Sequence, residues 1–148
     1  MLAFEPVLIT ILRAGLPIHQ GMLNMFDKAQ NGFISAYRKY DKEEFTIKIE
    51  YVSCPDLSGK TVILTDSMMA TGESMVQALR ELTGYGDPQH IHLVSVLASE
   101  EGVEKIRKTF SRDKVTIWLG AIDHEMTAKA YLVPGLGDAG DLAYGSKE

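Results

Sequence analysis

The sequence predicts an α/β fold in which a mostly parallel sheet is flanked by helices. Short apolar runs rich in β-branched residues are typical of strands buried on both faces; they span residues 7–12, 61–65, 91–97 and 115–119. Segments with helical spacing follow two of them, at 74–82 and 103–110, and the first is expected to place Met75, Ala78, Leu79 and Leu82 on one face. Because alternating strands and helices form parallel sheets through crossover connections, one domain over residues 1–148 is expected.

The remaining segments predict a hairpin and an irregular C-terminal part. An amphipathic helix is expected to begin near Pro17. Residues 34–37 and 45–52 flank a charged turn at 39–44, and the second run alternates apolar with polar residues. That alternation predicts a half-exposed strand, one arm of a hairpin. A loop is expected at residues 98–102, and the glycine-rich part from Asp123 onward is expected to lack regular structure.

Composition excludes several classes of protein. Hydrophobic residues make up 45% of the 148, which is enough for a core without disulfides or a structural metal. The net charge of -5 gives no electrostatic reason to expect nucleic acid or an anionic membrane as a partner. Cys54 is the only cysteine, so no internal disulfide forms and a reducing, cytoplasmic location is expected. No apolar run approaches the length of a membrane span.

The segment TVILTDSMMATGES, residues 61–74, predicts a site for a phosphate monoester. A buried strand leads into Asp66, a turn of small residues and the start of a helix. Backbone amides of residues 70–74 can converge there, and Gly72 permits a close approach of the backbone. Asp66 can accept hydrogen bonds from ribose hydroxyls. The alternative is an ordinary turn with Asp66 and Ser74 as helix caps, and this segment alone leaves both open.

Two further segments bear on that choice. ILRAGLP, residues 11–17, places Arg13 and the amides of Ala14 and Gly15 at another strand end, which suits a pyrophosphate. Alone, it also fits a surface arginine beside a tight turn. YLVPGLGDAGDLAYG, residues 131–145, contains four glycines and a proline. It is interpreted as a backbone-lined pocket for a small planar ligand, the alternative being a loose loop.

With these segments in this order, the chain resembles the uracil phosphoribosyltransferases. The resemblance covers nearly all of the chain, and its motifs are ILRAGL, Tyr37-Arg38, D-x-M-x-A-T-G-x-S, EGVE at 101–104 and YLVPGLGDAGD. It implies the type I phosphoribosyltransferase fold, with a β-hairpin arm and a glycine-rich C-terminal hood over the base. It also implies about seventy residues ahead of the ILRAG loop, where this sequence has residues 1–10, so the family's N-terminal segment is expected to be missing.

The resemblance assigns a role to each matching position. Asp66 would hold the ribose hydroxyls, and Arg13 the pyrophosphate together with Ala14 and Gly15. Arg38 would lie in a mobile region that closes over the site, and Asp138 near uracil N1. The 5′-phosphate would be bound by Ala70, Thr71, Gly72, Glu73 and Ser74, and the uracil edge by the backbones of Leu132, Gly137 and Ala139.

The implied reaction joins uracil to phosphoribosyl pyrophosphate, with Mg²⁺, and gives UMP and pyrophosphate. Asp138 and Arg13 are the expected catalytic residues; no protein ligand of the metal is assigned. Two alternatives are a phosphoribosyltransferase for another base and a weak or inactive relative that acts as a nucleotide-binding regulator. Exposed apolar residues of the hairpin such as Phe45 and Tyr51 suggest a homodimer or higher homo-oligomer. The four histidines lack metal-ligand spacing, apart from the weak pair His90 and His92.

Overall fold

The computed structural model describes residues 5–41 and 44–147, and within them a six-stranded sheet forms the centre of the molecule. Its order is β3-β2-β1-β4-β5-β6, and every neighbouring pair is parallel except β2 with β3. The strands are β1 (Val7–Leu12), β2 (Gln30–Asp41), β3 (Glu44–Ser53), β4 (Thr61–Met69), β5 (His90–Ser99) and β6 (Val115–Asp123). The predicted fold class is confirmed.

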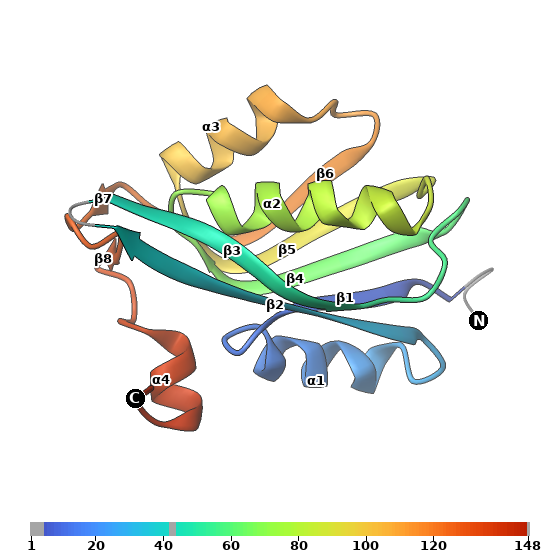
Figure 1. Ribbon diagram of the computed structural model, residues 1–148, viewed down its shortest axis with the longest axis horizontal. Helices are drawn as coiled ribbons and strands as arrows, with labels where there is room; N and C mark the ends of the chain where they lie inside the picture. The colour runs from blue at the N-terminus through green and yellow to red at the C-terminus, as the bar shows by residue number, and fades with distance from the viewer. Residues whose placement is uncertain (1–4, 42–43, 148) are drawn as a thin grey trace.

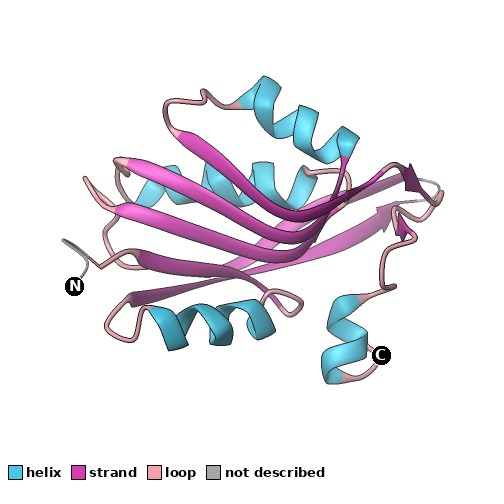
Figure 2. Cartoon of the chain, turned by 180° about the vertical axis from the view of Figure 1, so that it is seen from behind, coloured by secondary structure: helices cyan, strands magenta, loops and turns pink. Residues whose placement is uncertain are grey.

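Helices cover both faces of this sheet (Figure 1). α2 (Glu73–Leu82) and α3 (Glu100–Thr109) lie on one face, and α1 (Leu16–Met25) lies on the other. A 3₁₀ turn, η1 (Thr83–Tyr85), follows α2. The C-terminal part pairs β7 (Glu125–Met126) with β8 (Leu132–Val133) and ends in α4 (Ala139–Tyr144), which lies apart from the other helices in both views (Figure 2).

Apolar side chains on each face explain why these helices pack there. The α2 side holds the larger core, which includes Leu64 of β4. Four α2 residues predicted to share one face are all buried, namely Met75, Ala78, Leu79 and Leu82. On the α1 side, Leu8 and Ile63 pack against Met22, Leu23 and Phe26. Buried His19 joins α1 to β2 through a 2.7 Å hydrogen bond between its Nε2 and Asn31 Oδ1.

Several predicted boundaries are wrong because strand pairing continues past the local sequence signals. The hairpin strands reach Asp41 and Glu44, so most of the predicted charged turn lies within strands. Residues 42–43 and the side chain of Phe45 lie outside the described residues. β4 likewise continues through Asp66 to Met69, because residues 66–69 pair with β5.

Two predicted irregular segments contain helices. α3 begins at Glu100 because Ser99 caps it, accepting a hydrogen bond from the Gly102 N–H at 2.9 Å, so the loop expected at 98–102 is absent. α4 forms within the glycine-rich segment because Asp138 caps its first turn, accepting from the Asp141 N–H at 3.0 Å. In each segment, therefore, one short capping side chain determines where the helix begins.

The chain reverses its direction of winding between β1 and β4. From β1 it passes through α1 to β2 on one side, and from β4 through α2 to β5 on the other. α1 and α2 cover opposite faces, so the connections leaving β1 and β4 diverge. A crevice lined by Arg13 and Asp66, among others, lies at this edge of the sheet. Ligands of open α/β sheets bind at such switch points, and the predicted site residues come from these connections.

Candidate active site

The phosphate loop, residues 70–74, connects β4 to α2. Gly72 precedes the helix with a φ of 76°, a conformation that favours glycine. A Cβ on Gly72 would lie 2.9 Å from the Gly102 carbonyl oxygen, so this residue also allows α3 to pack closely on the loop. The Thr71 hydroxyl accepts from the Glu73 N–H at 3.3 Å. First-turn amides of α2 have no intrahelical acceptors, so they can bind an anion at this end of the helix.

Ser99 connects this loop to α3. Its Oγ donates to the Ala70 carbonyl oxygen and accepts from Gly102 N–H. Ser99→Ala is therefore expected to lower the free energy of unfolding by about 1–2 kcal/mol, since it removes a helix cap and a buried hydrogen bond. Urea denaturation measures this change, with Ser111→Ala as a control because Ser111 is exposed. Equal stability of Ser99→Ala and the wild type would contradict the capping role.

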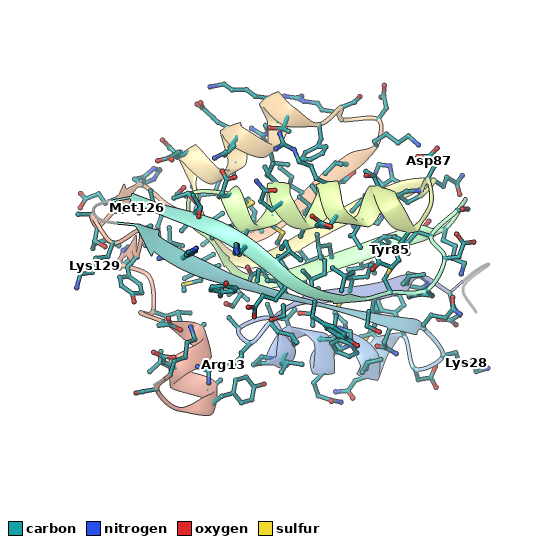
Figure 3. The ribbon with its side chains drawn as sticks, in the orientation of Figure 1. Arg13, Lys28, Tyr85, Asp87, Met126 and Lys129 are labelled. Atoms are coloured by element: carbon teal, nitrogen blue, oxygen red, sulfur yellow. The ribbon has the colours of Figure 1, made fainter. Side chains whose placement is uncertain are left out.

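Arg13 follows β1 and reaches across the crevice to the C-terminal segment (Figure 3). Its Nη2 donates to Asp141 Oδ1 at 2.7 Å and to the Gly145 carbonyl oxygen at 3.0 Å, while its buried Nε has no hydrogen-bond partner within the described part of the chain. The peptide bond between Leu12 and Arg13 is cis. Nε is thus a donor that a bound anion can satisfy.

The backbone amide of Gly15 is not exposed as the sequence led us to expect. The sequence suggested that its amide would be exposed for pyrophosphate, but Gly15 is buried and its N–H donates to the Ile11 carbonyl oxygen at 2.9 Å. A side chain here would overlap Thr10 Oγ1. Gly15 therefore shapes the turn between β1 and α1, and Arg13 and Ala14 are the members of this loop that line the cavity.

Asp66 lies in β4, ahead of the phosphate loop, and is largely buried. Burial raises the pKa of its carboxyl to about 7, although backbone N–H groups of Ser67 and Met68 and the charge of Arg38 favour the ionised form. Oδ1 accepts from the Ser67 N–H at 2.7 Å. Hydroxyl donors from a ligand would stabilise the carboxylate further, so the group is suited to receive hydrogen bonds from a ribose.

Arg38 extends from the hairpin arm toward the C-terminal segment. Its Nη1 donates to the Lys129 carbonyl oxygen at 3.0 Å, and its charge acts on Asp66. Lys129 lies beside the far end of the β2–β3 arm (Figure 3). The arm therefore lines one side of the crevice and contacts the segment that follows β6.

The C-terminal segment is held over the crevice by carboxylates. Buried Asp123, at the end of β6, accepts from the Gly135 N–H at 3.0 Å. Asp138 uses Oδ1 to cap α4, and its Oδ2 lies 3.8 Å from Lys147 Nζ. A Cβ on Gly140 would lie 3.7 Å from the Ala14 amide nitrogen, so the segment packs directly against the Arg13 loop. This contact places the two ligand-binding segments side by side.

These elements enclose a cavity of about 640 Å³. Its lining includes the predicted residues Arg13, Ala14, Arg38, Asp66, Ala70, Ser74, Leu132, Asp138 and Ala139. A smaller adjoining hollow is lined by the phosphate loop, including Thr71, Gly72 and Glu73, together with Arg38 and Asp66. Gly137 lines neither cavity. The volume suits a ligand of nucleotide size.

Sequence reasoning gave no role to four residues in or near the cavity. Asp141, the partner of Arg13, is the second acidic residue of GDAGD, and that repetition was the available signal. Tyr37 and Lys147 also line the cavity, and no sequence pattern pointed to Lys147. Lys105 forms an ion pair with Glu73. Contacts between distant elements cannot be deduced from local patterns.

The cavity offers a magnesium ion one suitable carboxylate rather than a complete set of protein ligands. Among residues 5–41 and 44–147, no group of three or more histidine, cysteine, aspartate or glutamate side chains could hold a metal. Mg²⁺ is commonly held by one or two carboxylates together with substrate phosphates and water. Asp138, the carboxylate of the C-terminal segment that lines the cavity, fits that mode.

No helix in the described part of the chain is long and apolar enough to cross a membrane.

The sheet order, the loop after β4 and the cavity at the switch point are those of the type I phosphoribosyltransferase fold. Solved structures of this class share the fold. A purine phosphoribosyltransferase from Pyrococcus horikoshii has a TM-score of 0.58 at 16% identity, covering 83% of this chain and 79% of its own. A hypoxanthine phosphoribosyltransferase from Staphylococcus aureus also has a TM-score of 0.58, at 13% identity, covering 84% of this chain and 65% of its own.

The chain belongs to the uracil phosphoribosyltransferase family, whose model matches residues 3–146. A uracil phosphoribosyltransferase of Porphyromonas gingivalis is 54% identical over 95% of this chain and 65% of its own length. One from Pyrococcus furiosus is 40% identical over 94% of this chain and 59% of its own. The AQ2163 protein from Aquifex aeolicus has a TM-score of 0.85 at 37% identity, covering 95% of this chain and 65% of its own. The chain thus spans about two thirds or less of these relatives.

Proposed function

We propose that this chain transfers the 5-phosphoribosyl group of phosphoribosyl pyrophosphate to uracil and releases UMP and pyrophosphate. The observation that carries the proposal is the cavity in which Arg13, Asp66 and Asp138 line a common space. The chain's family supports uracil as the base. The alternative of a phosphoribosyltransferase for another base, and that of a non-catalytic regulator, have no structural observation in their favour.

Under this proposal, each substrate group has a place among the residues that line the cavity. The 5′-phosphate binds the phosphate loop at the start of α2, and the ribose hydroxyls donate to Asp66. The pyrophosphate lies against the Arg13 loop, where the free Nε and the shared Nη2 are the available donors. Uracil lies against the backbones of Leu132, Asp138 and Ala139. Transfer requires N1 of the base to face C1′ of the ribose on the side opposite the pyrophosphate, and the proposed places of the three groups are chosen to meet that requirement.

In the reaction, the bond between C1′ and the pyrophosphate oxygen breaks and the bond between N1 and C1′ forms. Arg13 stabilises the charge that develops on the leaving pyrophosphate. Asp138 Oδ2 is the carboxylate oxygen that α4 capping leaves available to accept the N1 proton. When bound, Mg²⁺ would offset negative charge on the pyrophosphate. No covalent intermediate with the protein is required.

The test is UMP formation from uracil and phosphoribosyl pyrophosphate in the presence of Mg²⁺, with cytosine and hypoxanthine as competing bases. Turnover with uracil alone is expected. Preference for another base would contradict the substrate assignment. Binding of UMP without turnover would favour the regulatory alternative for this chain.

The cytoplasmic location and the homodimer expected from the sequence also belong to this proposal. Tyr51 on the edge strand β3 supports an assembly, because its side chain is 59% exposed. Sedimentation velocity measures the mass directly. A monomer at micromolar concentration would contradict the expected homo-oligomer.

A further inference from the structure

The phosphate loop contains an acidic side chain that should oppose its function. Glu73 is the first residue of α2, and it lines the same hollow as Thr71, Gly72 and Ser74. A phosphate monoester carries close to two negative charges at neutral pH. A carboxylate facing such a group would repel it, although a negative charge at a helix N-terminus is otherwise favourable.

The structure shows that both oxygens of this carboxylate are engaged by other residues. Lys105 of α3 forms an ion pair with Glu73 Oε2, and Gln77 Nε2 donates to Oε1 at 3.0 Å. The Lys105 ammonium is the main cause of the lowered pKa of Glu73, followed by the Gln77 hydrogen bond. The carboxylate is therefore ionised and held between one residue of α3 and the next turn of α2.

We infer that Lys105 is a positioning residue for the 5′-phosphate subsite: it fixes the Glu73 carboxylate on the α3 side of the loop and offsets its charge. The inference rests on the proposed function, since it concerns the phosphate of the same substrate. Lys105 is absent from the lining of both cavities, so it acts through Glu73 and does not contact the phosphate.

Three substitutions separate this role from a direct contact. Lys105→Met leaves the Glu73 charge unpaired beside the phosphate, so a three- to tenfold weaker affinity for UMP is expected. The KM for phosphoribosyl pyrophosphate rises by a similar factor while kcat changes little. Adding Glu73→Gln to Lys105→Met removes the charge and restores affinity to within about twofold of the wild type. Lys105→Arg keeps the cation and binds as the wild type does.

The experiment is calorimetric titration of UMP into the wild type and these variants, with steady-state kinetics in parallel. Lys108→Met is the matched control, because Lys108 lies on the same helix and pairs with exposed Glu104 away from the loop. UMP affinity of Lys105→Met equal to that of the wild type would overturn the inference. So would a double variant that binds as weakly as Lys105→Met, since that result assigns Lys105 a direct or purely structural role.

The same measurements distinguish this inference from the proposed function. Wild-type protein that binds UMP but does not convert uracil would overturn the proposed activity alone. In that case the ratio of UMP affinities between Lys105→Met and the wild type still tests the role of Lys105. Full turnover together with unchanged affinity in Lys105→Met would overturn the role of Lys105 alone.

Discussion

Asp66→Asn is expected to lower kcat/KM for phosphoribosyl pyrophosphate by about 10²-fold or more and, at the same time, to stabilise the protein. Loss of activity follows because two ribose hydroxyls lose a charged acceptor, each such hydrogen bond contributing about 1.5–3 kcal/mol. Stability rises because the variant no longer buries an ionised carboxylate. A functional residue that lowers the stability of its own fold is typical of active sites.

The stabilising effect depends on pH in a defined direction. In the unfolded chain the carboxyl titrates near its ordinary pKa, whereas burial in the folded state raises that pKa to about 7. Between about pH 4 and 7 the folded state therefore binds more protons than the unfolded state, and this group lowers stability as the pH rises. Asp66→Asn should gain up to about 4 kcal/mol over the wild type at pH 8 and little at pH 4.

Urea denaturation at several pH values measures this difference directly. Asp56→Asn is a suitable control because Asp56 is exposed, and its pKa is lowered by hydrogen bonds from Ser58. A stability difference between Asp66→Asn and the wild type that is independent of pH would contradict the raised pKa. Undiminished transfer to uracil would contradict the ribose-binding role.

Arg13→Met is expected to reduce kcat by about 10²–10³-fold, the usual cost of removing one donor that stabilises developing negative charge. Inhibition by the product pyrophosphate should weaken as well. Arg13→Lys should recover only part of the loss, since an ammonium lacks the planar fork of a guanidinium. The measurement is kcat together with the inhibition constant for pyrophosphate.

The structural contribution of Arg13 needs a separate control. Its half-exposed pair with Asp141 is expected to contribute at most about 1 kcal/mol to stability. Asp141→Asn removes the charge pair but leaves the guanidinium in the cavity, so its kcat should fall far less than that of Arg13→Met. Equal losses in the two variants would show that Arg13 acts mainly by holding the C-terminal segment.

The sequence predicted the parts of the fold that depend on local pattern. Residues 7–12 form the predicted strand, and the apolar face of α2 was predicted residue by residue. Errors occurred where tertiary pairing or one capping residue decided the outcome. Asp66 was expected after a strand and lies within it, and Ser99 and Asp138 begin helices where loops were expected.

In the candidate site, too, local sequence patterns predicted some residues, whereas contacts between distant elements could not be predicted. Arg13, Asp66 and the phosphate loop could be placed from sequence because each lies in or after the carboxyl-terminal part of a strand that ends at the crevice. The residues that pair with Arg13, Arg38 and Glu73 come from elements distant in the chain: they are Asp141, Lys129 and Lys105, respectively. No periodicity relates such positions, so only the assembled sheet shows that they meet.

The parallel pairing of β1 with β4 also bears on how the protein is made. Thr10 and Thr65, whose hydroxyls are hydrogen-bonded at 3.0 Å, are 55 positions apart, and Arg13 meets Asp141 across 128 positions. Non-local pairings of this kind form slowly, because loop-closure entropy opposes them before contacts compensate it. During synthesis, β2 follows β1 directly and can pair with one of its edges, whereas the other edge of β1 has no partner until β4 has been made. Because the lining of the cavity extends to Lys147, the crevice is complete only when nearly the whole chain has been synthesised.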